Sequence, residues 1–169
     1  KSLLLLISPA NPPNETTRNG QLIDGIDQTL QQLATKEFAT VQTEYFGASA
    51  VAVANAKLTY QRYQELFISR RWQALAGKGA QTQRLLWAST STKNPKYRDV
   101  VYVEELIGPD TVNTIPPATF EAFRDHGRPR ASLTEDVDCA FDTMSALAEV
   151  GISMKDTTST LLAEGVQIF

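Results

Sequence analysis

Three short segments constrain the fold of this 169-residue chain more than any other feature. We predict β-strands at residues 3–7 (LLLLI), 84–89 (RLLWAS) and 111–115 (TVNTI). Polar residues or prolines follow each of these segments. Strands without a polar face are typical of buried parallel sheets. Helical patterns lie between the three segments, so the order of elements predicts an α/β fold with parallel strands.

Helical periodicity marks most of the remaining chain. The expected helices cover residues 22–33, 49–67, 72–75, 117–126, 137–148 and 155–164. Pro117 suits the first turn of its helix, and Ser132-Leu-Thr-Glu135 has the form of a capping box before the stripe that starts at Val137. Three strands cannot close a barrel, because about eight are needed for a barrel whose interior side chains just fill it.

Composition excludes several classes of function. The net charge is −3 and the basic residues form no stripe, which gives nucleic-acid binding no electrostatic support. The single cysteine, Cys139, cannot form an internal disulfide and fits a reducing compartment. It lies beside an apolar stripe, where we expect it to pack. The longest apolar run, residues 3–7, is far shorter than the roughly 20 residues of a membrane span.

A polar cluster follows the strand at residues 84–89. The sequence there is ASTSTKN, in which hydroxyls precede a cation and an amide. At the C-terminal end of a barrel strand, such a cluster suits an anionic, hydroxyl-rich ligand. Lys93 would supply charge for a phosphate, while Ser89, Ser91 and Asn94 would supply hydrogen bonds. An ordinary polar loop with a solvated lysine fits the same residues, and spacing alone favours that alternative.

The residues around this cluster resemble a known family. The run WAST-x-TKNP-x-Y, followed by YVEELIGPDTVNTIPPATFEAFRDHG, is similar to the signature of the longer bacterial and plastid-type transaldolases. Upstream, ANAKLTYQRYQELF and RWQALAGKGAQTQRLLWAS resemble the same family, as does the ending GIS…LLAEGVQIF. The resemblance covers residues 47–169. Residues 1–46 form an atypical strand–loop–helix segment that matches the family weakly.

The resemblance implies a fold and a chemistry. The chain would be the C-terminal part of a TIM-type (β/α)8 barrel, with about three parallel strands and their flanking helices. Transaldolases move a dihydroxyacetone unit between sugar phosphates of the pentose phosphate pathway through a lysine Schiff base, without cofactor or metal. Lys93, with Asn94 beside it, would occupy the position where the family holds the substrate phosphate, and Ser8 would lie near the substrate at the end of the sixth strand.

Two departures from the family pattern bear on activity. The Schiff-base lysine and the catalytic acids of the family lie on earlier strands, in segments this chain does not contain, and none of its seven lysines lies within a strand pattern. The family also has an arginine soon after the serine of its sixth strand. Residues 9–14 here hold no cation, and Arg18 is the nearest candidate. We therefore expect no catalytic residue in this chain.

Three functions are compatible with these observations. The missing arginine and the atypical residues 9–46 favour a transaldolase-derived domain that is inactive alone and serves as a structural or interaction subunit of a larger assembly, and this is the function that we expect from the sequence. The intact WASTSTKNP run favours the C-terminal portion of an active transaldolase, or a sugar-phosphate-binding module. The expected partner is another protein chain or an N-terminal half-barrel, because the strands leave sheet edges uncovered. The expected compartment is the cytoplasm or the plastid stroma.

Several other residues have structural explanations. His126 is the only histidine and stands at a helix end, where a cation suits the helix dipole. Glu104 and Glu105 are neighbours on a helix and point apart, so we expect both on the solvated surface. The two tryptophans, Trp72 and Trp87, are expected to pack, as are the tyrosines.

Overall fold

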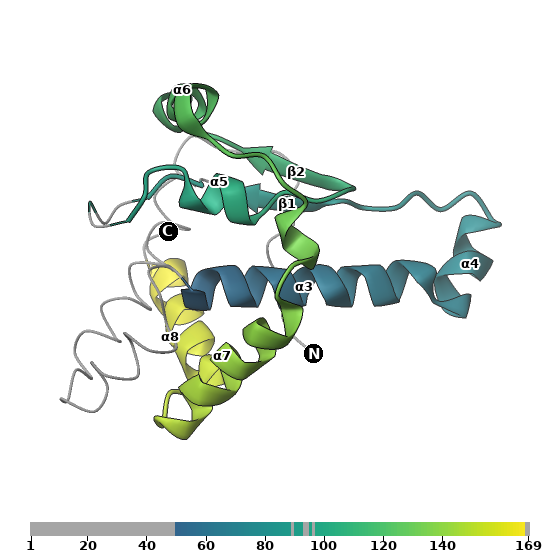
Figure 1. Ribbon diagram of the computed structural model, residues 1–169. Coiled ribbons are helices and arrows are strands. Elements are labelled where there is room, and N and C mark those ends of the chain that lie inside the picture. Colours follow the sequence, from purple (N-terminus) through teal and green to yellow (C-terminus); the bar gives the residue numbers. More distant parts are fainter. Residues whose placement is uncertain (1–49, 89, 93–94, 96, 168–169) are drawn as a thin grey trace.

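The computed structural model describes residues 50–88, 90–92, 95 and 97–167 (Figure 1). The strand expected at residues 3–7 and the helix at 22–33 lie outside these residues. The described elements are, in chain order, α3 (Ala50–Ile68), α4 (Arg70–Ala76), β1 (Leu85–Ala88), α5 (Val101–Glu105), β2 (Thr111–Thr114), α6 (Pro117–His126), the 3-10 helix η1 (Ser132–Thr134), α7 (Val137–Glu149) and α8 (Met154–Gln167).

The two described strands form a parallel pair. Leu85 of β1 is in register with Thr111 of β2, and Ala88 with Thr114. The parallel pairing expected from the sequence is confirmed. Burial differs between the strands, because residues of β1 alternate between buried and half-buried whereas none of β2 is fully buried. The expectation that both strands are buried on both faces is therefore wrong for β2, where threonine and asparagine occupy three of four positions.

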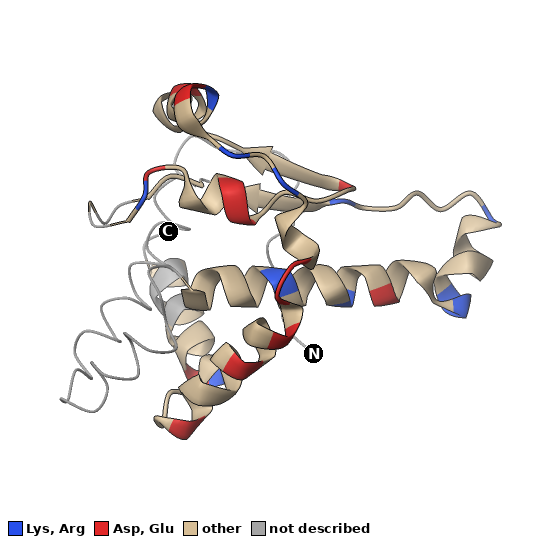
Figure 2. Cartoon of the chain, viewed as in Figure 1, with Lys and Arg blue, Asp and Glu red and all other residues tan. Residues whose placement is uncertain are grey.

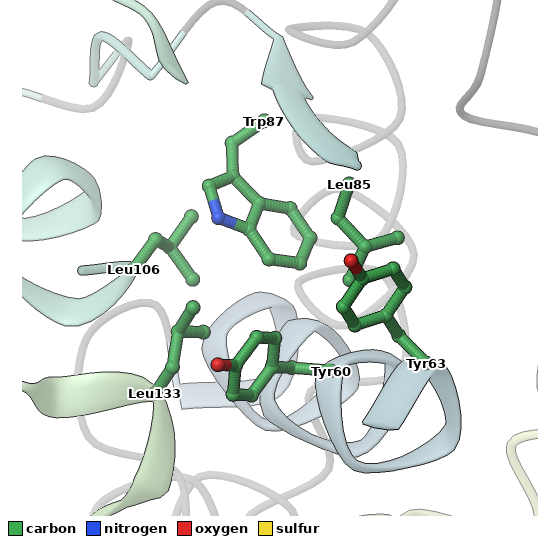
Figure 3. Packing of buried hydrophobic residues seen from close by; sticks show 6 residues of the cluster. All are labelled: Tyr60, Tyr63, Leu85, Trp87, Leu106 and Leu133. Atoms are coloured by element: carbon green, nitrogen blue, oxygen red, sulfur yellow. The ribbon is translucent and has the colours of Figure 1, made fainter. Parts of the chain in front are cut away.

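The main core lies between β1 and α3, which runs beside the sheet (Figure 1). Figure 3 shows Trp87 of β1 facing Tyr60 and Leu133. Trp87 is only 5% exposed. The complete cluster consists of Tyr60, Tyr63, Leu85, Trp87, Leu106 and Leu133. Full burial of such side chains stabilises a fold by about 1.5–3 kcal/mol each. The packing role expected for Trp87 and the tyrosines of α3 is confirmed.

A second, smaller core joins the start of α3 to α7. Val51, Leu147 and Ile152 are buried together there. The apolar stripe expected from Val137 onward forms as helix α7, but not all of it is covered, since Phe141 is 55% exposed. Cys139 is also exposed, so its expected packing role is wrong.

The residues expected to form a capping box make a different structure. Ser132 belongs to η1, and its hydroxyl accepts a hydrogen bond from the backbone N–H of Ile107 at 3.1 Å. The backbone N–H of Leu133 donates in turn to the carbonyl of Ile107 at 3.1 Å. Helix α7 begins later, at Val137, after Asp136 in a left-handed conformation with φ of 51°. The pairing with Ile107 takes Ser132 away from any capping role.

Candidate functional site

The C-terminal ends of β1 and β2 are joined by side chains. Thr90 lies two residues beyond β1, is buried, and donates from Oγ1 to Oδ1 of Asn113 on β2 at 2.8 Å. Thr114 donates from Oγ1 to the backbone carbonyl of Trp87 at 3.3 Å. These two bonds bring the start of the polar cluster against the neighbouring strand. In a parallel α/β fold, this end of the sheet is where ligands bind.

Of the site residues predicted from the sequence, Ser91 falls within the described residues. It directly follows the anchored Thr90 and is half-buried. Ser89, Lys93, Asn94 and Ser8 lie outside the described residues. The structure adds Asn113, which the sequence reasoning missed. The available signal was the amide side chain of Asn113 within a short predicted strand, because a polar side chain inside a sheet needs a hydrogen-bond partner.

Downstream of the polar cluster, an ion pair joins the segment before α5 to that helix. Arg98 donates from Nε to Oε2 of Glu104 at 3.1 Å and from Nη2 to Oε1 at 2.8 Å. Oε1 also accepts the backbone N–H of Arg128 at 2.8 Å. The Arg98 guanidinium, with help from this N–H, holds the pKa of Glu104 below its usual value. The expectation of a solvated Glu104 is wrong, because partners outside its helix allow its burial.

A second group of charges links α5 to α3 and to the segment before α7; α5 itself carries acidic residues (red in Figure 2). Glu105 is paired with Arg130 and lies 3.6 Å from Nζ of the buried Lys57. Nζ donates to the carbonyl of Glu135 at 2.9 Å, and Nε of Arg130 lies 2.7 Å from Oε2 of Glu135. The half-buried Glu105 is thus not a solvated surface residue either, and Lys57 is engaged structurally.

His126 ends α6 between two carboxylates. Its Nε2 lies 2.9 Å from Oδ1 of Asp99, and its Nδ1 lies 3.1 Å from Oδ2 of Asp125. Hydrogen bonds to Asp99 and then Asp125 raise the pKa of the imidazole above its usual value. The backbone carbonyl of His126 accepts a hydrogen bond from Nη2 of Arg98 at 2.7 Å. These contacts agree with the structural role expected for His126.

The described residues also bear on metal binding and on membrane insertion. Over the part of the chain that the structure describes, no group of three or more His, Cys, Asp or Glu side chains is placed to hold a metal ion. Among the helices of the same residues, none is both long and apolar enough to cross a membrane.

Sequence comparison decides the family. The family model described as transaldolase/fructose-6-phosphate aldolase matches residues 23–169. The chain belongs to this family. The resemblance stated from the WASTSTKNP run is thereby confirmed.

Proteins named transaldolase are similar to this chain over most of its length. "Transaldolase 2" of Nostoc punctiforme is 51% identical over 121 residues, which are 70% of this chain and 32% of that protein. "Transaldolase" of Frankia alni is 45% identical over 145 residues, 85% of this chain and 38% of that protein. "Transaldolase" of Acidothermus cellulolyticus is 52% identical over 119 residues, 70% and 32% respectively. The chain thus spans about a third of the length of these relatives.

Membership in the transaldolase family implies a TIM-barrel fold. The described residues contribute one parallel pair, β1 and β2, with helices around it, which fits part of such a barrel. Active sites of TIM barrels lie at the C-terminal ends of the strands. In this member of the transaldolase family, that end holds the Thr90–Asn113 hydrogen bond and Ser91.

Proposed function

We propose that this chain is the C-terminal portion of a transaldolase and binds the phosphate of the sugar substrate. One observation carries the proposal: the hydroxyl-rich cluster that leads to Lys93 starts at the C-terminal end of β1, where Thr90 is tied to β2 at 2.8 Å. TIM-barrel enzymes bind their substrates at this end of the strands. Residues 84–89 and 111–115 would be the seventh and eighth strands of the barrel.

The relatives favour this function over a purely structural subunit. The absence of a cation in residues 9–14 points to a domain that has lost catalysis. Identity of 51% to a protein named transaldolase favours a portion of an active enzyme. This observation carries more weight, because one loop position is weaker evidence than similarity over 121 residues. We therefore prefer the portion of a working enzyme to the structural subunit.

The residues that the chain contains determine which part of the reaction it would support. A dihydroxyacetone unit in transfer would be bound as a Schiff base to a lysine outside this chain, on an earlier strand of the barrel. Lys93 would pair with the substrate phosphate as a point charge, and Ser89, Ser91 and Asn94 would donate hydrogen bonds to its oxygens. This chemistry needs neither a metal nor a cofactor. Ser8 would face the substrate from the sixth strand.

An N-terminal half-barrel is the partner that this function requires. Among the described residues, β1 and β2 each have one neighbouring strand, which leaves one edge of each without a partner there. Exposed edges carry unpaired backbone donors and acceptors that invite pairing with further strands. The half-barrel would cover these edges and supply the Schiff-base lysine. We place the protein in the cytoplasm or the plastid stroma.

Titration with fructose 6-phosphate tests the proposal. Lys93→Ala should weaken its binding about 10- to 100-fold, because hydrogen bonds to charged groups contribute about 1.5–3 kcal/mol. Lys78→Ala is the matched control, since Lys78 lies between α4 and β1, in the segment that precedes the strand and not at its C-terminal end. Equal affinity in the wild type and Lys93→Ala would remove Lys93 from the site. A sugar-phosphate-binding module would give the same titration but no transfer of the dihydroxyacetone unit.

A further inference from the structure

We propose that the first turn of α6 binds the phosphate group of a sugar phosphate, through the backbone N–H groups of Ala118 and Thr119 and the hydroxyl of Thr119. The inference rests on the proposed function, because it adds donors for the same class of ligand. These donors follow β2, whereas the polar cluster of the proposed function follows β1. All of them lie within the described part of the chain.

Helix α6 starts at the end of the sheet where barrel enzymes bind their ligands. β2 ends at Thr114 and α6 begins at Pro117, so two residues separate the C-terminal end of the strand from the first turn of the helix. Figure 1 shows α6 directly after β2. In TIM barrels, the loops after the last two strands and the N-terminus of a short helix frequently form a phosphate site. The place of α6 in the chain therefore suits a phosphate.

Two backbone donors at the start of α6 have no acceptor within the described residues. Pro117 carries no N–H, and the N–H of Phe120 is the first of the helix to donate to a backbone carbonyl, that of Pro116 at 2.9 Å. Pro116 is also the N-cap residue, and no side chain caps the helix there. The N–H groups of Ala118 and Thr119 are therefore left for another acceptor. The positive end of the helix dipole adds to their attraction for an anion.

The side chain of Thr119 supplies a third donor, and this one is buried. Thr119 is 7% exposed, yet its hydroxyl makes no hydrogen bond within the described residues. The oxygen is not completely enclosed by protein atoms, so a ligand can reach it. Because the Cα–Cβ bonds of a helix tilt toward its N-terminus, this side chain leans toward the two N–H groups. A buried hydroxyl without a partner is costly, and a phosphate oxygen at this helix end would accept its hydrogen bond.

The charges of α6 favour an anion at its N-terminus. The first turn contains no acidic residue, so no carboxylate of that turn competes with a phosphate for the donors. The acidic residue that follows, Glu121, is an exposed partner of Arg124. Both basic residues of the last turn, Arg124 and His126, lie at the opposite end of the helix.

Substitutions at Thr119 separate a ligand site from a structural role. Thr119→Val keeps the shape of the side chain and removes the hydroxyl. Loss of an unpaired buried hydroxyl should raise the unfolding midpoint of the free protein, whereas loss of a donor to phosphate should lower the affinity for fructose 6-phosphate about 10- to 100-fold. Thr119→Ser keeps the hydroxyl and should keep the affinity.

A carboxylate at Ala118 tests the backbone donors. Ala118 is exposed, and Ala118→Asp places a negative charge that suits the positive end of the helix but repels a phosphate. Affinity should therefore fall without a loss of stability. Ala74→Asp is the matched control, because Ala74 is also exposed on a helix and α4 lies far from α6 (Figure 1). The two substitutions change the net charge equally, so a general electrostatic effect on anion binding would appear in both.

The experiment measures dissociation constants for fructose 6-phosphate and inorganic phosphate, together with the unfolding midpoint without ligand, in the protein at its native length. Thr119→Val and Ala118→Asp should weaken both ligands, while Ala74→Asp leaves them unchanged. Unchanged affinity in Thr119→Val, or equal losses in Ala118→Asp and Ala74→Asp, would overturn the inference. If Lys93→Ala weakens binding but Thr119→Val does not, the α6 site alone fails. If Thr119→Val weakens binding but Lys93→Ala does not, the role of Lys93 in the proposed function fails and the α6 site stands.

Discussion

Gly108 lies against the core at a place where a side chain has no room. An ideal Cβ at this position would be 2.7 Å from Cδ1 and 3.1 Å from Cβ of Leu133. Leu133 is fully buried between β1 and α3, so it cannot move aside without disturbing Tyr60 and Trp87. The close approach lets the chain after α5 pack directly on η1.

Gly108→Ala should lower the free energy of unfolding by about 1–3 kcal/mol, the usual cost of overpacking a core. Urea denaturation measures it. Gly77→Ala is the control, because Gly77 has φ of −62° and the nearest atom to an added Cβ is 3.5 Å away. We expect that substitution to be neutral or slightly stabilising. Equal effects of the two substitutions would show that the contact with Leu133 is not tight.

Residues with local signals were predicted better than residues whose partners are remote. The burial of Trp87 could be predicted from its place in an apolar strand. The burial of Glu104 could not, because it depends on Arg98 and on the backbone of Arg128, 24 positions later. The sequence pattern of α5 does not indicate these partners, because both lie outside the helix. The same limitation hid Asn113, whose partner Thr90 lies two residues beyond the end of the other strand.

At the scale of elements, the bounds of α6 illustrate what sequence can specify. Pro117 opens the helix and Gly127 follows its end, as expected, and the N–H of Gly127 donates to the carbonyl of Phe123 at 2.8 Å. Helix α7 begins at Val137 as expected, but the capping box expected before it does not form, because a tertiary contact of Ser132 with Ile107 competes with local capping. The strand at residues 3–7 lies outside the described residues and stays a prediction.

The contact between α6 and the segment before α5 should respond to pH. The pKa of His126 is raised above its usual 6.5, mainly by Asp99, so its pairing stabilises the fold fully below about pH 6.5. That contribution is lost as the pH rises through the raised pKa. The pKa of Asp99 is lowered from 3.8, so its contribution is present above that pH and is lost as the pH falls through the lowered value.

Urea midpoints at pH 6, 7 and 8 test this contact. The wild-type protein should lose stability relative to His126→Gln as the pH rises across this range, because glutamine at position 126 does not titrate. Glu121→Gln is a control on the same helix, where Glu121 makes an exposed ion pair with Arg124. Parallel pH curves for the wild type and His126→Gln would contradict the assignment.

At the scale of the whole molecule, the 169-residue chain should not form a Schiff base by itself. None of its lysines lies within a predicted strand, and the buried Lys57 is held by the carbonyl of Glu135 and the carboxylate of Glu105. A Schiff-base lysine instead needs a free amine with a lowered pKa. Borohydride treatment with fructose 6-phosphate, followed by intact mass measurement, should give no adduct. A stable adduct on any of the seven lysines would contradict this prediction.

The family could be read from the WASTSTKNP run and its surroundings because those residues are contiguous in sequence. The structure bears out only part of the predicted architecture: within the described residues, β1 and β2 form one parallel pair. How a barrel closes depends on strands that contact one another across long stretches of chain. Local periodicity carries no information on such contacts.

The central claim, that this chain supplies the phosphate site of a transaldolase, is tested most directly by steady-state kinetics of the protein at its native length. The measurement compares wild type, Lys93→Ala and Lys78→Ala in transfer of a dihydroxyacetone unit from fructose 6-phosphate to a sugar-phosphate acceptor. We predict transfer by the wild type and by Lys78→Ala, and an increase of about 10- to 100-fold in KM for fructose 6-phosphate in Lys93→Ala. A folded wild-type protein without transfer, or an unchanged KM in Lys93→Ala, would contradict the claim.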